Sequence, residues 1–175
     1  MKTIIAALLA GAVCALSSFA LAKEKKEGSK EASDKTTTVA ATAEHKILAP
    51  ADITWGDAPP AFPAGAKLAV LDGDPGKKAS FTVRLQAPDG YKIAPHTHPA
   101  AELVTVISGT LHLGMGDKFD ESAAREMTPG SFAVMPAGMK HFAWFTGETV
   151  VQINAMGPFE IKYVNQADDP RQAKK

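Results

Sequence analysis

Short apolar runs separated by turn-forming residues make up most of the chain beyond residue 44. In residues 80–86, Phe81, Val83 and Leu85 alternate with polar residues, and this period of two places the three side chains on one face of a strand. Glycine and proline separate the runs, as in residues 72–76. Helical periodicity is nearly absent. The pattern predicts an all-β domain of about ten short strands, in a barrel or a jelly roll.

The bounds of the expected strands follow from the apolar runs. They are residues 45–50, 67–71, 80–86, 103–107, 110–115, 131–135, 141–146, 149–155 and 159–164. Tight turns at Ser108-Gly109 and Gly147-Glu148 are expected to separate two pairs of these strands. Residues 116–127 form a polar excursion with room for one helical turn.

The two ends of the chain differ from the middle in composition. Residues 1–22 have a basic start, an apolar run and small residues at positions 20 and 22, the pattern of a secretory signal peptide cleaved after Ala22. A membrane anchor is the alternative, but small and polar residues dilute the run. Residues 23–43 are typical of a disordered charged linker, 44–165 of one barrel domain, and 166–175 of a loose polar tail. A periplasmic or secreted protein is predicted.

Charge and cysteine content narrow the range of partners. The 175 residues include 19 basic and 19 acidic ones, so no excess charge attracts nucleic acid or an anionic membrane over distance. Cys14, the only cysteine, lies in the signal segment, so the mature protein would have no disulfide and no reactive thiol. We expect a small-molecule partner, no nucleic acid, and no stable membrane insertion after signal cleavage.

Candidate metal ligands are concentrated in residues 90–109. His96, His98 and Glu102 share one parity, so on an extended chain their side chains would lie on one face. His141 is a candidate fourth ligand. Imidazole nitrogen and carboxylate oxygen suit divalent ions of the first transition row, and four such ligands leave positions open in an octahedral site. The alternatives are a surface turn for the paired histidines and a core position for His141.

These residues also resemble the two motifs of the cupin superfamily. The first, G-x5-H-x-H-x3-E-x6-G, is filled throughout by Gly90, His96, His98, Glu102 and Gly109. The second, G-x5-P-x-G-x2-H-x3-N, is filled by Gly130, Pro136, Gly138 and His141, with Phe145 in place of the asparagine. The resemblance implies a small single-domain (monocupin) cupin-type β-barrel or jelly roll. It also implies one metal ion held by His96, His98, Glu102 and His141.

The ion and its surroundings are less defined. Iron(II) and manganese(II) are the leading ions, one per subunit, with nickel, copper and zinc behind them. Phe145, Met135 and Met139 are candidates to line a hydrophobic pocket, and His112 is expected to be structural or an outer partner of a ligand. The pattern identifies no catalytic acid or base; Tyr91, Lys92, His112, Lys140 and the acidic residues of 117–126 are the candidates.

Three functions fit this pattern. The first is a metalloenzyme acting on a small molecule, an oxidoreductase of dioxygenase type, an oxalate-type decarboxylase or oxidase, or an isomerase; the resemblance favours this group without separating its members. The second is a non-catalytic binding or sensor protein, and the third a structural protein of the cell envelope. An exposed sheet edge is a hazard unless it is covered, so a homodimer is expected.

Overall fold

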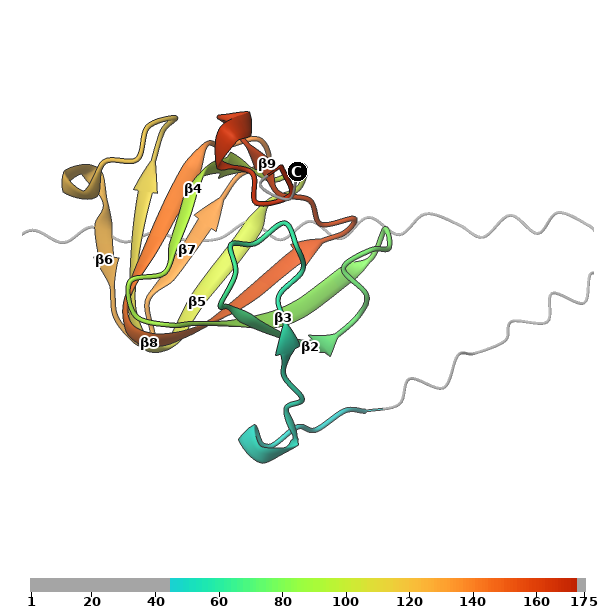
Figure 1. Cartoon of the computed structure of the whole chain (residues 1–175). Coiled ribbons are helices and arrows are strands. Elements are labelled where there is room, and N and C mark those ends of the chain that lie inside the picture. Colours follow the sequence, from blue (N-terminus) through green and yellow to red (C-terminus); the bar gives the residue numbers. More distant parts are fainter. Residues whose placement is uncertain (1–44, 173–175) are drawn as a thin grey trace, which may run out of the picture. The chain divides into compact units, whose positions relative to one another are not determined.

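The computed structural model of the chain describes residues 45–172 (Figure 1). Within this range nine strands form one antiparallel sheet, and three short 3-10 helices lie in the connections. The strands are β1 (Gly56–Asp57), β2 (Lys67–Asp72), β3 (Ser80–Ala87), β4 (Lys92–Thr97), β5 (Glu102–Met115), β6 (Arg125–Met127), β7 (Phe132–Met135), β8 (His141–Met156) and β9 (Lys162–Tyr163). The 3-10 helices are η1 (Pro50–Asp52), η2 (Glu121–Ala123) and η3 (Gln166–Asp168). The predicted signal peptide and linker lie outside the described residues.

Two long strands, β5 and β8, organise the sheet. β5 pairs with β8 along one edge of β8, while β4 and β3 share the other edge, β4 beside its first residues and β3 beside its last. The other edge of β5 carries β7 and β6. Figure 1 shows both long strands curving strongly, so that the sheet curls around an interior. The predicted all-β barrel or jelly roll is confirmed.

The predicted tight turns at Ser108-Gly109 and Gly147-Glu148 are wrong, because β5 and β8 each continue through them. The ladder shifts register between the pairs Ser108–Val150 and Thr110–Thr146, so both glycines lie in a bulge rather than at a strand end. Gly109 has φ 75° and Gly147 has φ 68°, a conformation that hairpin turns and bulges both use. The sequence therefore located the two glycines with positive φ correctly but did not distinguish a bulge from a hairpin turn.

Two further boundary predictions are corrected near the ends of the domain. Residues 45–50 form no strand; Ile47 is 84% exposed and the segment has no ladder partner. The strand expected at 159–164 is reduced to β9, which pairs with β4.

The tail differs from the expected loose segment as far as residue 172. Arg171 donates through Nη2 to the carbonyl of Ile161 at 3.0 Å and forms an ion pair with Asp169 at 2.7 Å. The chain therefore continues along the barrel after β9, with η3 between.

The predicted inward face of β3 is confirmed. Phe81, Val83 and Leu85 are each at most 2% exposed and belong to the main apolar cluster. Burying a side chain of this size stabilises the fold by about 1.5–3 kcal/mol relative to leaving it exposed. The interior that surrounds the candidate ligands is therefore a packed apolar core.

The outer face of the barrel carries a smaller apolar contact. Phe142 is fully buried, yet its ring lies 4.9 Å from that of Phe119 in the excursion between β5 and β6. Lys92 pairs with Glu121 at 2.8 Å across the same excursion. Phe142 therefore packs on the outer side of β8, while Phe145 belongs to the core.

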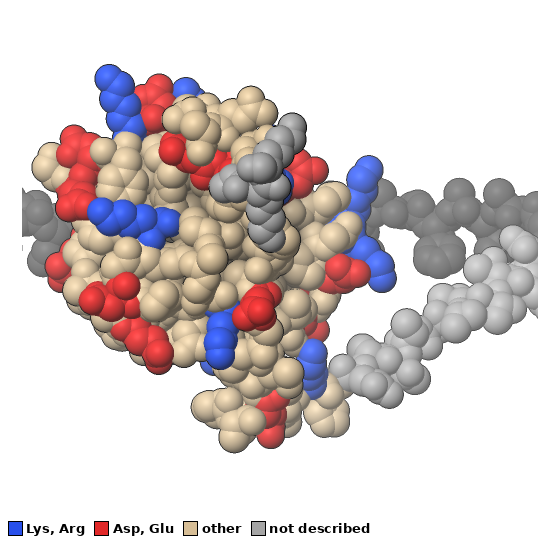
Figure 2. Space-filling view, viewed as in Figure 1, with Lys and Arg blue, Asp and Glu red and all other residues tan. Residues whose placement is uncertain are grey.

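Charge is mixed on the visible surface. Figure 2 shows basic and acidic side chains interspersed on one face, with broad uncharged areas between them. That face has no continuous basic surface of the kind that binds a polyanion. Within residues 45–172 no helix is long and apolar enough to cross a bilayer.

Candidate metal centre

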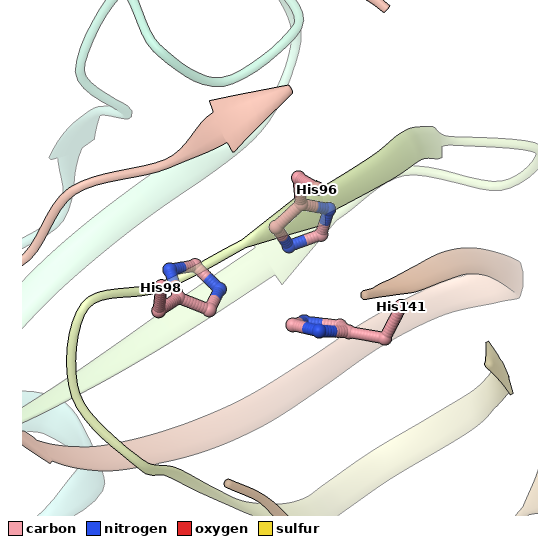
Figure 3. A group of neighbouring side chains, drawn as sticks. All are labelled: His96, His98 and His141. Carbon is pink, nitrogen blue, oxygen red and sulfur yellow. The ribbon is translucent and has the colours of Figure 1, made fainter. Parts of the chain in front are cut away.

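Three histidines converge inside the barrel (Figure 3). His96 lies near the end of β4, His98 directly follows that strand, and His141 begins β8. One ring nitrogen of each lies within 4.8 Å of the others, and all three side chains are buried. His96 and His141 are direct ladder partners of β4 and β8, which explains how residues from the two motifs meet.

Glu102, the predicted fourth ligand, joins them from β5. Its Oε2 lies 3.5 Å from Nε2 of His98 and 3.3 Å from Nε2 of His141. The shared parity that predicted this convergence is not its cause, because the chain bends at residues 99–101 between β4 and β5. The four side chains meet because the end of β4 and the first residues of β5 and β8 face one interior point.

Backbone carbonyls fix the orientation of each imidazole. Nδ1 of His96 lies 2.8 Å from the carbonyl oxygen of Ala94, and Nδ1 of His98 lies 2.8 Å from that of Glu160. Nδ1 of His141 lies 3.1 Å from the carbonyl oxygen of Met139. A carbonyl only accepts, so each Nδ1 carries the proton and donates it. In the neutral tautomer each Nε2 then presents a lone pair, the arrangement found in metal-ligating histidines.

The donor set fits a cation. Inward lone pairs and a carboxylate are all acceptors, so they repel one another unless a proton or a metal ion lies between them. Nε2 of His98 is a buried atom with no hydrogen-bond partner in the described part of the chain. A buried polar atom left without a partner costs about 1–3 kcal/mol. These residues therefore fit a divalent ion, which would satisfy all four groups at once.

The protonation states that the buried site favours are those that metal ligands require. Burial lowers the pKa of His96 to about 3, helped by the neighbouring His141 and His98. Burial likewise lowers the pKa of His98. For Glu102, burial raises the pKa, but the contacts of its carboxylate with His141 and His98 lower it by more, so the net shift is downward. A metal ion binds neutral imidazole and ionised carboxylate, so little proton release opposes binding at neutral pH.

A small apolar cavity of about 40 Å³ adjoins the four side chains. Besides the four polar groups its wall is apolar: Phe62, Leu85, Ile93, Val104, Leu111, Leu113, Met135, Ala143, Phe145, Val151, Ile153, Phe159 and Ile161. Met135 and Phe145 line it as expected. Met139 does not; it is 39% exposed and lies outside the wall.

The wall holds two aromatic residues that sequence reasoning missed. Phe159 stacks on His98 with ring centroids 4.5 Å apart and planes 17° from parallel. Phe62 comes from the loop between β1 and β2 and is 7% exposed. A signal existed for Phe62, since it is the one large apolar residue among the prolines of residues 59–63.

The candidate acids and bases lie away from the cavity. His112 points outward from β5, stacks on Trp144 at 4.6 Å and contacts the Thr146 hydroxyl at 3.0 Å. Tyr91 is buried, and its hydroxyl donates to the carbonyl of Pro63 at 2.6 Å. Lys92 and Lys140 form exposed ion pairs with acidic residues of the 117–126 segment. Apart from the candidate ligands, the described lining contains no titratable side chain.

The fold and these side chains define a class. A curled antiparallel sheet that holds three inward histidines in an apolar interior is a β-barrel of the metal-binding kind. Residues 83–156 match the family model of the cupin domain, a span that includes β4, β5 and all four candidate ligands. Residues 83–156 are therefore a cupin domain.

Known proteins resemble this chain over different extents. Germin-like protein 9-3 of Oryza sativa subsp. japonica is 32% identical over 84 residues, which cover 47% of this chain and 39% of that protein. The chain thus spans about two-fifths of the length of that curated relative. The likeness therefore does not extend to the whole relative.

Two solved structures share the fold. The polyketide cyclase RemF from Streptomyces resistomycificus has a TM-score of 0.57 and 18% identity, covering 74% of this chain and 92% of that one. A candidate acetylacetone dioxygenase from Methylibium petroleiphilum has a TM-score of 0.56 and 17% identity, covering 73% and 85%. At these identities the likeness shows the fold alone, and two different activities on one fold show that the barrel does not fix the chemistry.

Proposed function

We propose that this protein is a mononuclear metal-dependent oxidoreductase that acts on a small molecule. The observation that carries the proposal is the convergence of His96, His98, His141 and Glu102 on one interior point beside an apolar cavity. Iron(II) or manganese(II) is the preferred ion, because both accept a mixed nitrogen and oxygen ligand set in octahedral geometry. When bound, the ion supplies redox chemistry at the positions that the protein leaves open.

The cavity wall favours redox chemistry over hydrolysis or isomerisation. Those reactions commonly use a side chain to move a proton, within about 3 Å of the reacting atom. Apart from the candidate ligands, the lining of the cavity within residues 45–172 is apolar. The residues of the wall therefore exclude water and limit the size of the substrate. The only titratable groups in the described lining of the cavity are those of the candidate ligands.

Metal analysis and oxygen uptake test this proposal. The protein is purified without an affinity tag, its metal content is measured, and oxygen uptake is followed over a panel of small oxidisable and carboxylate substrates. We expect about one iron or manganese per chain and turnover that the His96→Ala variant lacks. The His112→Ala variant is the matched control, because His112 lies on the outer face of the barrel. Stoichiometric metal without turnover on any substrate would contradict an enzymatic role.

A non-catalytic binding or sensor protein is the second candidate. The apolar wall of the cavity supports this candidate too. A wall without an acid or a base can bind a ligand without taking part in any reaction of it. Incubation of the metal-loaded protein with a thermal-shift ligand separates the two. Recovery of an unchanged ligand supports binding, whereas a chemically altered ligand supports the enzyme.

We further propose that the protein functions outside the cytoplasm, after cleavage behind Ala22. The support is the basic, apolar and small-residue order of residues 1–22. Expression in a bacterial host followed by fractionation tests it. Processed protein in the periplasm is the expected result, and full-length protein in the cytoplasm would count against it.

We also propose that two copies associate along β7. This strand pairs only with β5 in the described sheet, and its Phe132 and Val134 are 59% and 49% exposed. A free strand edge with exposed apolar side chains favours pairing with a second strand. Light scattering should give a dimer mass, and the Phe132→Lys and Val134→Lys substitutions should shift it to a monomer. A monomer in the unmodified protein would contradict the proposal.

A further inference from the structure

The loop between β1 and β2 separates the metal cavity from a large surface hollow. The hollow has a volume of about 710 Å³ and is formed mainly by residues 57–66, with Asp168 and Pro170 on the other side. Phe62 lines this hollow and also lines the inner cavity of about 40 Å³. Its ring, 7% exposed, is therefore a partition between solvent and the candidate ligands.

Two tyrosines hold the loop in place. The Tyr91 hydroxyl donates to the carbonyl of Pro63 at 2.6 Å, and the Tyr163 hydroxyl donates to the carbonyl of Ala61 at 2.8 Å. These carbonyls lie on either side of Phe62, and the tyrosines come from the segment before β4 and from β9. Burial raises the pKa of both phenols, to about 12 for Tyr163, so both remain hydrogen-bond donors at neutral pH. The loop is thus fastened at two points around its buried ring.

The inner cavity is too small for most metabolites. A cavity of about 150 Å³ is needed to hold benzene, so a space of about 40 Å³ admits a ligand of only a few atoms. A substrate with a carbon skeleton therefore needs a wall residue to move. Most of the wall belongs to β3, β4, β5 and β8, whose backbones are fixed by ladders on both sides. Phe62 lies on a loop without ladder bonds, so it can be displaced without breaking the sheet.

We propose that Phe62 is the gate of the metal cavity and sets the largest ligand that can enter. The proposal rests on the proposed metal site and adds to it the route of entry and the residue that limits size. Leu113 borders both the inner cavity and a second hollow, the groove beside β6 and β7, and so offers the alternative route. It lies within β5 between ladders with β8 and β6, which makes it the less mobile partition.

The test measures access to the buried histidines and does not require a bound ion. Diethyl pyrocarbonate acylates exposed neutral imidazole, and mass spectrometry of peptides gives a separate rate for each histidine. His112, on the outer face, serves as the internal reference. In the metal-free Phe62→Ala variant we expect the rates at the candidate ligands to rise by about tenfold relative to His112, because the partition no longer has to open.

Matched variants separate the gate from general loosening. Phe145→Ala removes the same ring from the same cavity, but Phe145 does not border the outer hollow, so its effect should be small. Leu113→Ala tests the other route and should also have little effect. The Tyr91→Phe and Tyr163→Phe variants release the loop without changing the cavity wall and should raise the rates, which keeps the test valid if Phe62→Ala folds poorly.

A second readout follows the loaded protein. Loss of Mn²⁺ to excess EDTA should be faster in Phe62→Ala than in Phe145→Ala and slower in Phe62→Trp. Equal acylation rates in Phe62→Ala and Phe145→Ala, or a larger rise in Leu113→Ala, would overturn the gate. If the protein binds no metal but the acylation pattern is as expected, the gate stands and the proposed function fails.

Discussion

Replacing Glu102 by glutamine should show how much the charge of this carboxylate stabilises the fold without metal and how much it contributes to metal binding. The substitution keeps the shape of the side chain and removes its charge. Glu102 is 6% exposed, and its Oε2 lies 3.5 Å from Nε2 of His98 and 3.3 Å from Nε2 of His141. A buried carboxylate costs several kcal/mol in lost hydration, but the contacts with His141 and His98 outweigh this cost, since the net pKa shift of Glu102 is downward. The ionised carboxylate then stabilises the fold above its unfolded pKa, so the metal-free Glu102→Gln protein should be less stable than the unmodified protein at pH 7.

With metal the loss is larger. An ion present at 100 times its dissociation constant stabilises the fold by about 2.7 kcal/mol. Loss of the one anionic ligand should weaken binding by about 100-fold or more, since even outer partners of ligands contribute 10–100-fold. At the same metal concentration only about 0.4 kcal/mol of stabilisation remains. For a domain of roughly 130 residues the lost 2.3 kcal/mol corresponds to about 8 °C in Tm.

Thermal unfolding followed by circular dichroism, with Mn²⁺ and after its removal, measures both effects in one experiment. Glu126→Gln is the matched control, because Glu126 is an exposed strand glutamate on β6. The control should keep the full Mn²⁺-induced rise in Tm. If Glu102→Gln also keeps it, Glu102 is not a ligand and the four-residue set has to be abandoned.

Three further predictions follow from the same contacts. His98→Ala should abolish metal binding, measured by elemental analysis, and destabilise the metal-free barrel by a few kcal/mol, because it leaves Glu102 with fewer partners and opens a void; unchanged metal content would show that His98 is not a ligand. His96 has a folded pKa of about 3, below its ordinary value, so the unfolded chain takes up a proton that the folded chain does not as pH falls below about 6.5. Urea unfolding of the metal-free protein should thus show a loss of about 2 kcal/mol from this group between pH 7 and pH 5, and an equal loss in His96→Gln would refute the assignment. Gly109→Ala should destabilise the fold by about 2 kcal/mol or more, since its methyl would meet the backbone of β8, whereas Gly130→Ala, also at positive φ but in open space, should lose only about 1 kcal/mol.

The candidate site could be predicted from the sequence because its residues are few and their spacing is specific. His96, His98 and Glu102 lie within seven positions, and His141 follows its own proline and glycine signals. The structure brings the three histidines together and places Glu102 beside His98 and His141, although not by the mechanism that parity suggested. A bend at residues 99–101 takes Glu102 onto a different strand. The spacing of the residues thus predicted that their side chains lie close together but not that they lie on different strands.

The course of the long strands could not be predicted, for a physical reason. Gly109 and Gly147 adopt positive φ, and a glycine next to a polar residue suits a hairpin as well as a bulge. The choice depends on whether the partner strand continues alongside, which is a non-local fact. Here β8 runs beside β5 on both sides of the bulge, and the Thr149 hydroxyl accepts from the Thr110 backbone N–H at 3.0 Å. Such tertiary pairing overrides the local turn signal.

The proposed gate depends on the difference between wall residues on strands held by ladders and Phe62, which lies on a loop outside the ladders. The candidate ligands on β4, β5 and the start of β8 are positioned by ladders, and the histidines also by carbonyls at Nδ1, so they would need little reorganisation to hold an ion. A larger ligand needs a wall residue outside these ladders to move, and the loop that carries Phe62 meets that requirement. Variation in this loop would thus change the substrate while leaving the metal site intact.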